Sequence, residues 1–230
     1  MRSTYIDIID QDIVFGLMNN NKKLKSFISD FPSYDNIISH SEKKKKEFSK
    51  ENRIRLVNEI KEQYKGIKIS KELNNNINSL LNEKTFSVTS GHQLSLFSGP
   101  IYFIYKIIST IKIVSELNKK SKKQKFVPVF WLASEDHDFD EIAKVNISGK
   151  SLKWEKETLN QPVGKINSNN IEKVIKEYKN QIIDSKYSSK LIKLIDDNYT
   201  SFTSLSKATR SFINQLFFEY GVIVLSLIHI

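Results

Sequence analysis

Acidic side chains crowd into one short segment, Ser134-Glu135-Asp136-His137-Asp138-Phe139-Asp140-Glu141, which holds five carboxylates and an imidazole. Neighbouring carboxylates repel each other unless a cation, an amine or basic side chains lie close to them. Three functional uses fit this composition: holding Mg²⁺ on a nucleotide, binding the ammonium group of a substrate, or accepting a proton from an amine nucleophile. Clusters of Asp and His also bind zinc or iron, so the identity of any metal stays open. The structural alternative is an acidic loop that pairs with the many lysines of the chain.

The acidic segment directly follows an almost entirely apolar run, Phe126–Ala133. Acids beside the end of a buried strand are poorly explained by solvation alone, which favours a functional segment. If the backbone stays extended there, Asp136, Asp138 and Asp140 point to the same side. The candidate catalytic residues of this segment are Asp136, His137 and Asp138, to which His92 of the loop described next is added, and the candidate substrate ligands are Glu135 and Asp140.

A second candidate segment, Gly91–Pro100, is a glycine-bounded loop that leads into a helix. Such a loop offers backbone N–H groups and the positive end of the helix to an anion. It lacks the Gly-Lys-Ser/Thr ending of a P-loop and the GxGxxG spacing of a dinucleotide site, so the phosphate signal is weak by itself. His92 could contact a phosphate or donate to a developing negative charge, or it could cap backbone groups as an ordinary loop residue. Lys106, two turns into the helix, either reaches back toward this site or extends along the helix to the surface.

The elements that position these residues form a strand–loop–helix–strand unit. Residues 85–89 predict a strand, Pro100 sits where a helix begins, and 101–117 continues as a helix that is apolar on most sides. Residues 126–133 predict a strand buried on both faces of a parallel sheet. Ligands of such sheets bind beyond the carboxyl ends of the strands. The loop and the acidic segment should therefore face each other across one crevice.

The remaining elements predict an α/β fold whose parallel-sheet core follows an N-terminal helical segment. Residues 1–83 are mainly helical, with helices over 41–64 and 70–82 and Ser70 as an N-cap. Residues 84–225 form the core, which also contains an inserted hairpin and helices. The hairpin pairs 143–147 with 151–156 around Gly149-Lys150, helices cover 170–183, 188–196 and 203–219, and a third core strand covers 221–225.

Composition limits the function classes. No apolar run in the 230 residues is long enough to span a bilayer, and the N-terminus is not a signal peptide, which predicts a cytoplasmic protein without a membrane partner. The absence of cysteine excludes disulfides and thiolate metal sites, so any cysteine chemistry uses cysteine as a substrate. The net charge of +10 attracts anions, but only four of the 36 basic residues are Arg. Recognition of nucleic acid favours the guanidinium group, so we do not expect a nucleic-acid partner.

Both candidate segments match blocks of a known family. The residues from Ser90-Gly91-His92-Gln93-Leu94 through Leu96-Phe97-Ser98-Gly99-Pro100-Ile101-Tyr102 to Tyr105-Lys106-Ile107 resemble its TGQQ-x-GLF-x-GPLY-x-x-x-K block. The run from Pro128-Val129-Phe130-Trp131-Leu132-Ala133 to the end of the acidic segment resembles its PVFW-x-x-x-EDHDFDE block. Pro162-Val163-Gly164 and Phe217–Leu225 match further landmarks. On these residues the chain is similar to the cysteine-adding ligases of bacillithiol biosynthesis, over nearly its whole length to Leu225.

The resemblance implies a Rossmann-like core like that of class I aminoacyl-tRNA synthetases, and a ligase that adds cysteine to glucosaminyl malate by forming an amide. The partners would be these two small molecules, with ATP as the expected co-substrate, Mg²⁺ as a candidate ion and a homodimer in the full-length family. The loop would hold nucleotide phosphates, with His92 and Lys106 stabilising charge there. The acids would bind the sugar amine or Mg²⁺, with Asp136 or Asp138 as the base. The nucleotide and substrate ligands are then Gly91, Gln93, Ser98, Gly99, Tyr102, Lys106, Glu135 and Asp140.

Two departures from the family pattern stand out. His92 occupies a position where many relatives carry Gln, and the family's chain continues well beyond the last strand. We interpret Ser226–Ile230 as the scar of a truncation or frameshift, with the family's coiled-coil dimerisation part missing, so this chain could be inactive alone. The alternatives are a nucleotidyl-transfer or nucleotide-sugar enzyme on the same fold, or a non-catalytic module that binds nucleotide or nucleic acid. The sequence leaves open whether activation is adenylation or phosphorylation.

Overall fold

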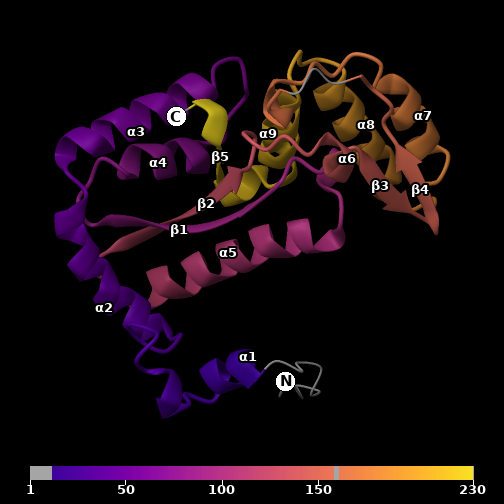
Figure 1. Cartoon of the computed structure of the whole chain (residues 1–230). Coiled ribbons are helices and arrows are strands. Elements are labelled where there is room, and N and C mark those ends of the chain that lie inside the picture. Colours follow the sequence, from indigo (N-terminus) through magenta and orange to yellow (C-terminus); the bar gives the residue numbers. More distant parts are fainter. Residues whose placement is uncertain (1–11, 158–160, 230) are drawn as a thin grey trace.

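The structure, a computed structural model, describes residues 12–157 and 161–229 (Figure 1). Residues 1–11 of the predicted helical segment and Ile230 of the predicted scar lie outside this range. The helices in it are α1 (Asp12–Met18), α2 (Tyr34–Lys44), α3 (Lys50–Gln63), α4 (Lys71–Ser79), α5 (Ile101–Lys120), α6 (Phe139–Ile142), α7 (Glu172–Lys179), α8 (Ser188–Tyr199) and α9 (Leu205–Leu216). The strands are β1 (Thr85–His92), β2 (Lys125–Leu132), β3 (Lys144–Ile147), β4 (Lys150–Lys153) and β5 (Ile223–Ser226).

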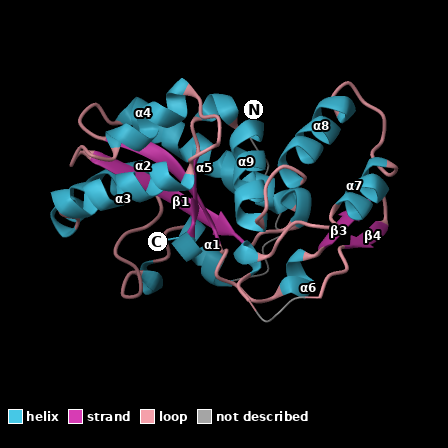
Figure 2. Cartoon of the chain, turned by 90° about the horizontal axis from the view of Figure 1, so that it is seen from above, coloured by secondary structure: helices cyan, strands magenta, loops and turns pink. Residues whose placement is uncertain are grey.

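A parallel sheet of β1, β2 and β5, in the order β1-β2-β5, forms the centre of the fold. This arrangement confirms the predicted α/β class and its parallel core. Helix α5 covers one face of the sheet, and α3 and α4 lie over the other (Figure 1). Helices α7 and α8 and the β3–β4 hairpin gather beyond the carboxyl ends of the strands (Figure 2).

Helix α5 forms where the sequence predicts it. Pro100 is its N-cap residue with a φ of −66°, the angle that the proline ring imposes. The side chains that α5 buries recur every three or four residues and are Phe103, Ile107, Thr110, Val114 and Leu117. The opposite side carries exposed Ile101, Tyr105 and Ile108, so the helix is covered on one side only.

The predicted helix over 41–64 is wrong as a single element. Helix α2 ends at Lys44, and α3 begins at Lys50. Between them the Ser49 hydroxyl accepts a hydrogen bond from the Asn52 N–H at 3.1 Å, so a serine N-cap starts a new helix. The predicted cap at Ser70 is confirmed, because its hydroxyl accepts from the Leu73 N–H at 3.0 Å.

The hairpin turn also differs by one residue from the prediction. Strand β3 ends at Ile147 and β4 begins at Lys150, so the turn residues are Ser148 and Gly149. Both have positive φ, 50° and 76°, as a two-residue hairpin loop of the primed type requires.

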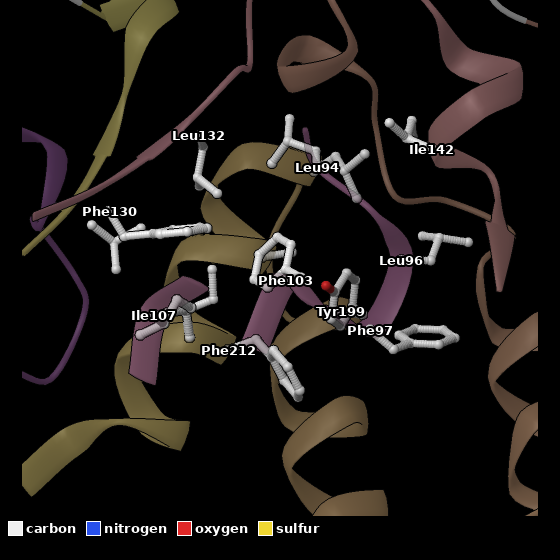
Figure 3. Close-up of a cluster of buried hydrophobic side chains, with 14 of the residues drawn as sticks. Leu94, Leu96, Phe97, Phe103, Ile107, Phe130, Leu132, Ile142, Tyr199 and Phe212 are labelled. Atoms are coloured by element: carbon white, nitrogen blue, oxygen red, sulfur yellow. The ribbon is translucent and has the colours of Figure 1, made fainter. Parts of the chain in front are cut away.

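A cluster of buried side chains fixes the loop that follows β1. Leu94 and Leu96 are fully buried, and Phe97 packs edge-on against Tyr199 with ring centroids 5.0 Å apart (Figure 3). Phe103 of α5 packs against Phe130 of β2 at the same centroid distance. The loop is therefore anchored in the core by its apolar residues, which fixes where its polar ones lie. No helix in residues 12–157 or 161–229 combines the length and the apolar character needed to cross a membrane.

Candidate active site

The loop after β1 and the acidic segment after β2 touch each other. The Gln93 side-chain amide donates a hydrogen bond to the Glu141 carboxylate at 2.9 Å. Just before the two segments, at the strand ends, the Ala133 N–H donates to the His92 carbonyl at 3.0 Å. This hydrogen bond continues the β1–β2 pairing beyond the end of β2. The structure therefore brings together the two segments that the sequence singles out, at the carboxyl edge of the sheet.

The acidic segment is folded into a turn and a short helix. The expectation that an extended backbone points Asp136, Asp138 and Asp140 one way is wrong, because the chain turns at 134–135 and α6 begins at Phe139. Asp138 is the N-cap of α6, and its carboxylate accepts from the Glu141 N–H at 3.0 Å. One oxygen of Asp136 accepts from the backbone N–H groups of His137 and Asp138 at 2.7 and 3.2 Å. Local backbone hydrogen bonds thus fix the directions of Asp136 and Asp138.

The carboxylates do not converge on one point. Asp140 pairs with Lys153 of β4 at 2.9 Å, and this hydrogen bond lowers the pKa of the Asp140 carboxyl. Glu135 is exposed on the turn. Within residues 12–157 and 161–229, no three His, Asp or Glu side chains gather in a way that could hold a metal ion.

A cavity of about 400 Å³ opens beside the acids. Its lining comprises His137, Asp138, Phe139, Asp140, Lys153, Trp154, Glu155 and Lys156. The cavity thus lies between the acidic segment and the end of the hairpin, and Lys153 and Lys156 are the basic groups among its lining residues. The loop after β1 is not among these lining residues, and its Gln93 contacts Glu141, which lies outside the cavity lining.

Two of the predicted loop ligands, Ser98 and Gly99, lie in the tightly packed part of the loop. Ser98 is buried, and its hydroxyl has no hydrogen-bond partner among the described residues, so it does not present a group at the surface. Phe97, Ser98 and Gly99 have successive positive φ angles of 51°, 68° and 33°, a strained path that a tightly packed loop can hold. At Gly99 an added Cβ would lie 2.3 Å from the Ser95 Cβ, so glycine is needed there for space as well.

Gly91 lies within β1, because the strand extends to His92 instead of ending at Thr89 as the sequence predicts. Its register partner across the sheet is Trp131, and an added Cβ would lie 1.9 Å from the indole Nε1. The glycine therefore makes room for a tryptophan of the neighbouring strand. Lys106 does reach back to this strand end: its Nζ donates to the Gly91 carbonyl at 3.2 Å and lies 5.6 Å from the Tyr102 ring centroid.

His92 is held by aromatic rings at the end of β1. Its imidazole lies 5.0 Å from the Tyr102 ring and 5.3 Å from the Phe103 ring, centroid to centroid. Nδ1 lies 3.2 Å from the Gln93 carbonyl oxygen, which can only accept, so Nδ1 carries the proton in this contact. Burial lowers the pKa of His92 and favours the neutral ring. Its Nε2 then accepts a proton more readily than it donates to a phosphate.

This environment predicts a pH dependence of stability. The folded state prefers neutral His92, so its contribution is present above the unfolded pKa of about 6.5 and is lost as the pH falls below that value. Urea unfolding at pH 7.5 and pH 5.5 should show a larger loss of unfolding free energy for the unmodified chain than for His92→Gln. An equal loss in both chains would show that the ring does not carry this effect.

The sequence did not identify the residues outside the acidic segment that stabilise it through hydrogen bonds. The Gly164 N–H donates to the Ser134 carbonyl at 2.9 Å, and the Val163 N–H donates to the Asp136 carbonyl at 2.7 Å. An added Cβ at Gly164 would lie 2.6 Å from the Ser134 Cβ. The hydroxyls of Ser134 and Ser226 lie 2.6 Å apart and connect this turn to the end of β5. Pro162-Val163-Gly164 was visible as a sequence landmark, but nothing in it indicated which segment it would contact.

A comparison with protein families matches residues 1–227 to the model described as "Bacillithiol biosynthesis BshC, N-terminal Rossmann-like domain". The chain belongs to this family. The match confirms the family that the two blocks indicated and the Rossmann-like core seen in the parallel sheet.

Curated BshC relatives give the same result. Three of them carry the name "Putative cysteine ligase BshC". The relative from Flavobacterium johnsoniae is 41% identical over 208 residues, which are 90% of this chain and 39% of the relative. Those from Flavobacterium psychrophilum and Christiangramia forsetii are 36% and 33% identical over 93% of this chain and 40% of each relative. The chain thus spans about two fifths of the length of the BshC relatives that it matches.

Proposed function

We propose that this chain forms the N-terminal part of a ligase that joins the carboxyl group of cysteine to the amine of glucosaminyl malate, as the last step of bacillithiol formation. The observation that carries the proposal is the hydrogen bond between Gln93 and Glu141, which places the loop after β1 against the acids after β2. The family to which the chain belongs, and the ligase name of its relatives, support the reaction class.

The cavity beside α6 has the charges that glucosaminyl malate requires. The sugar carries an amine, and Asp138 lines the cavity with its carboxylate fixed by the cap contact with Glu141. The malate carries two carboxylates, and the same cavity is lined by Lys156 and by Lys153, which pairs with Asp140. As the amine attacks the activated carboxyl carbon, the C–N bond forms and Asp138 accepts the proton that leaves nitrogen. The bond between the carboxyl carbon and its activating group breaks, which releases AMP or phosphate.

Activation of cysteine requires a co-substrate, because a carboxylate and an amine do not condense readily in water. We propose ATP for this step, bound over the loop after β1 and the start of α5. Lys106, which already donates to the Gly91 carbonyl, supplies positive charge there. Neutral His92, whose Nδ1 is used in the contact with the Gln93 carbonyl, would accept a proton on Nε2 at this end of the site. The described acids do not gather into a metal cluster, so the proposal assigns no metal ligand.

The test is product formation by a completed enzyme. This chain, joined to the remaining C-terminal part of the Flavobacterium johnsoniae relative, should form bacillithiol from cysteine, ATP and glucosaminyl malate, as detected by mass spectrometry. Omitting any one of the three should abolish the product. Product without ATP would refute nucleotide dependence, and no product under conditions where the unmodified relative is active would refute the function for this chain.

A further inference from the structure

Lysines gather at the amino ends of β1 and β2. These strand ends lie at the far end of the sheet from α6 and the hairpin (Figure 1). We propose that this surface, which we call the lysine surface and define as Lys84, Lys122, Lys123 and Lys125, binds a small multivalent anion of the polyphosphate type. The proposal is independent of the candidate active site, which lies at the carboxyl ends of the same strands.

Two adjacent hollows share the lysine surface. They measure about 780 and 660 Å³, and both are lined by Lys84, Lys122, Lys123 and Gln124. Lys125 lines the larger hollow and Lys120 the smaller one. Each hollow is large enough for a small-molecule anion.

The lysines of this surface form no ion pair with any acid of the described part of the chain. Within the described residues, none of Lys84, Lys122, Lys123 and Lys125 has a carboxylate within the 4.0 Å of an ion pair.

Glu83 and Glu42 lie near the lysine surface. Glu83 pairs with Lys45 at 2.7 Å. Glu42 lines the smaller hollow, where its carboxylate accepts from the Gln124 amide, and no carboxylate is among the residues that line the larger hollow. Like charges held together raise the free energy of the folded state unless an anion neutralises them.

Helix stabilisation does not account for this clustering. Lys119 and Lys120 lie in the last turn of α5, where their positive charges interact favourably with the negative end of the helix dipole. Lys122 and Lys123 lie beyond the helix end, which is capped at Ser121. Lys84 and Lys125 are brought together by the strands themselves, since the Lys125 N–H donates to the Lys84 carbonyl at 3.0 Å.

The neutral groups of the larger hollow indicate the class of ligand. Its lining adds the side-chain amides of Asn75, Asn78 and Asn82, which can donate to phosphate oxygens. Neither hollow is lined by an arginine or an aromatic residue. Nucleic-acid surfaces use guanidinium groups and stacking rings, so a compact polyanion fits this surface better than RNA.

The test is isothermal titration of the full 230-residue chain with inorganic tripolyphosphate at 0.15 M salt. The chain should bind it saturably, and Lys122→Glu combined with Lys123→Glu should weaken binding at least tenfold. The matched control combines Lys22→Glu with Lys23→Glu, which changes the net charge equally on an exposed turn far along the chain and should leave the affinity within twofold. Equal weakening by both double substitutions would show that binding depends on net charge alone, which would contradict a specific site at the lysine surface.

Two further sets of substitutions test whether the lysine surface itself binds tripolyphosphate. Lys122→Gln with Lys123→Gln, which adds no negative charge, should also weaken binding. Lys150→Gln should leave it unchanged, because Lys150 is an exposed residue of the hairpin at the other end of the sheet. Tripolyphosphate binding that is unaffected by Lys122→Gln with Lys123→Gln, or RNA binding in its place with no response to tripolyphosphate, would overturn the proposal.

Discussion

Asp138→Asn should lower bacillithiol formation by the completed enzyme at least about 100-fold, the effect expected when a general base is removed. The substitution separates chemistry from structure. Asn is as good an N-cap as Asp, so its side-chain oxygen can still accept from the Glu141 N–H and start α6. What it removes is the negative charge and the capacity to take up the amine proton. The loss should therefore appear without a change in thermal stability.

The matched control is Asp184→Asn, which removes an exposed acid from the turn between α7 and α8. It should leave product formation within twofold. Asp138→Ala should be inactive and also less stable by about 1 kcal/mol, because it removes the cap as well. Full activity of Asp138→Asn would remove Asp138 from the mechanism, whatever the activity of the alanine variant.

Arg210→Ala should destabilise the chain by about 3–5 kcal/mol, the range expected when a large buried side chain and charge-assisted hydrogen bonds are lost together. Arg210 is 1% exposed, and its guanidinium donates to the Gln63 backbone carbonyl at 2.7 Å and to the Gln63 side-chain oxygen at 2.6 Å. Gln63 in turn accepts from the Ser226 N–H at 2.9 Å. The arginine thus connects α9 to α3 and, through Gln63, to the end of β5.

Urea unfolding followed by tryptophan fluorescence measures this change, because Trp154 is buried and reports on the folded state. The control is Arg55→Ala, whose guanidinium pairs with Glu51 one helical turn away while both side chains are exposed. That substitution should change the unfolding free energy by no more than about 0.5 kcal/mol. A loss below about 1 kcal/mol for Arg210→Ala would show that the buried network contributes little.

Elements set by local rules could be predicted from the sequence. Pro100 marks the start of α5, Ser70 caps α4, and the apolar run after Gln124 forms β2, because each depends on residues next to one another. The placement of the two candidate segments at one edge of the sheet also follows from the strand–helix–strand order, since parallel strands end on the same side.

The details of the site depended on contacts that are distant in sequence. Gly91 lies within β1, and glycine is required there because the Trp131 side chain of the next strand occupies the space of a Cβ, which no local pattern indicates. The turn in the acidic segment is stabilised by residues about thirty positions later. The Val163 and Gly164 N–H groups donate hydrogen bonds to carbonyls of this segment. The directions of these carboxylates depend on N-capping and on the ion pair with Lys153. The prediction that alternate acids of an extended segment point to one side was therefore wrong.

The central claim is that the loop after β1 and the acids after β2 serve one ligand. NMR titration of this chain with glucosaminyl malate tests it most directly, through the signals of the Gln93 side-chain amide and the His137 ring. We predict that both signals shift along one saturable curve with a common affinity. Saturable binding that moves His137 and leaves Gln93 unchanged, or that moves neither, would contradict the claim.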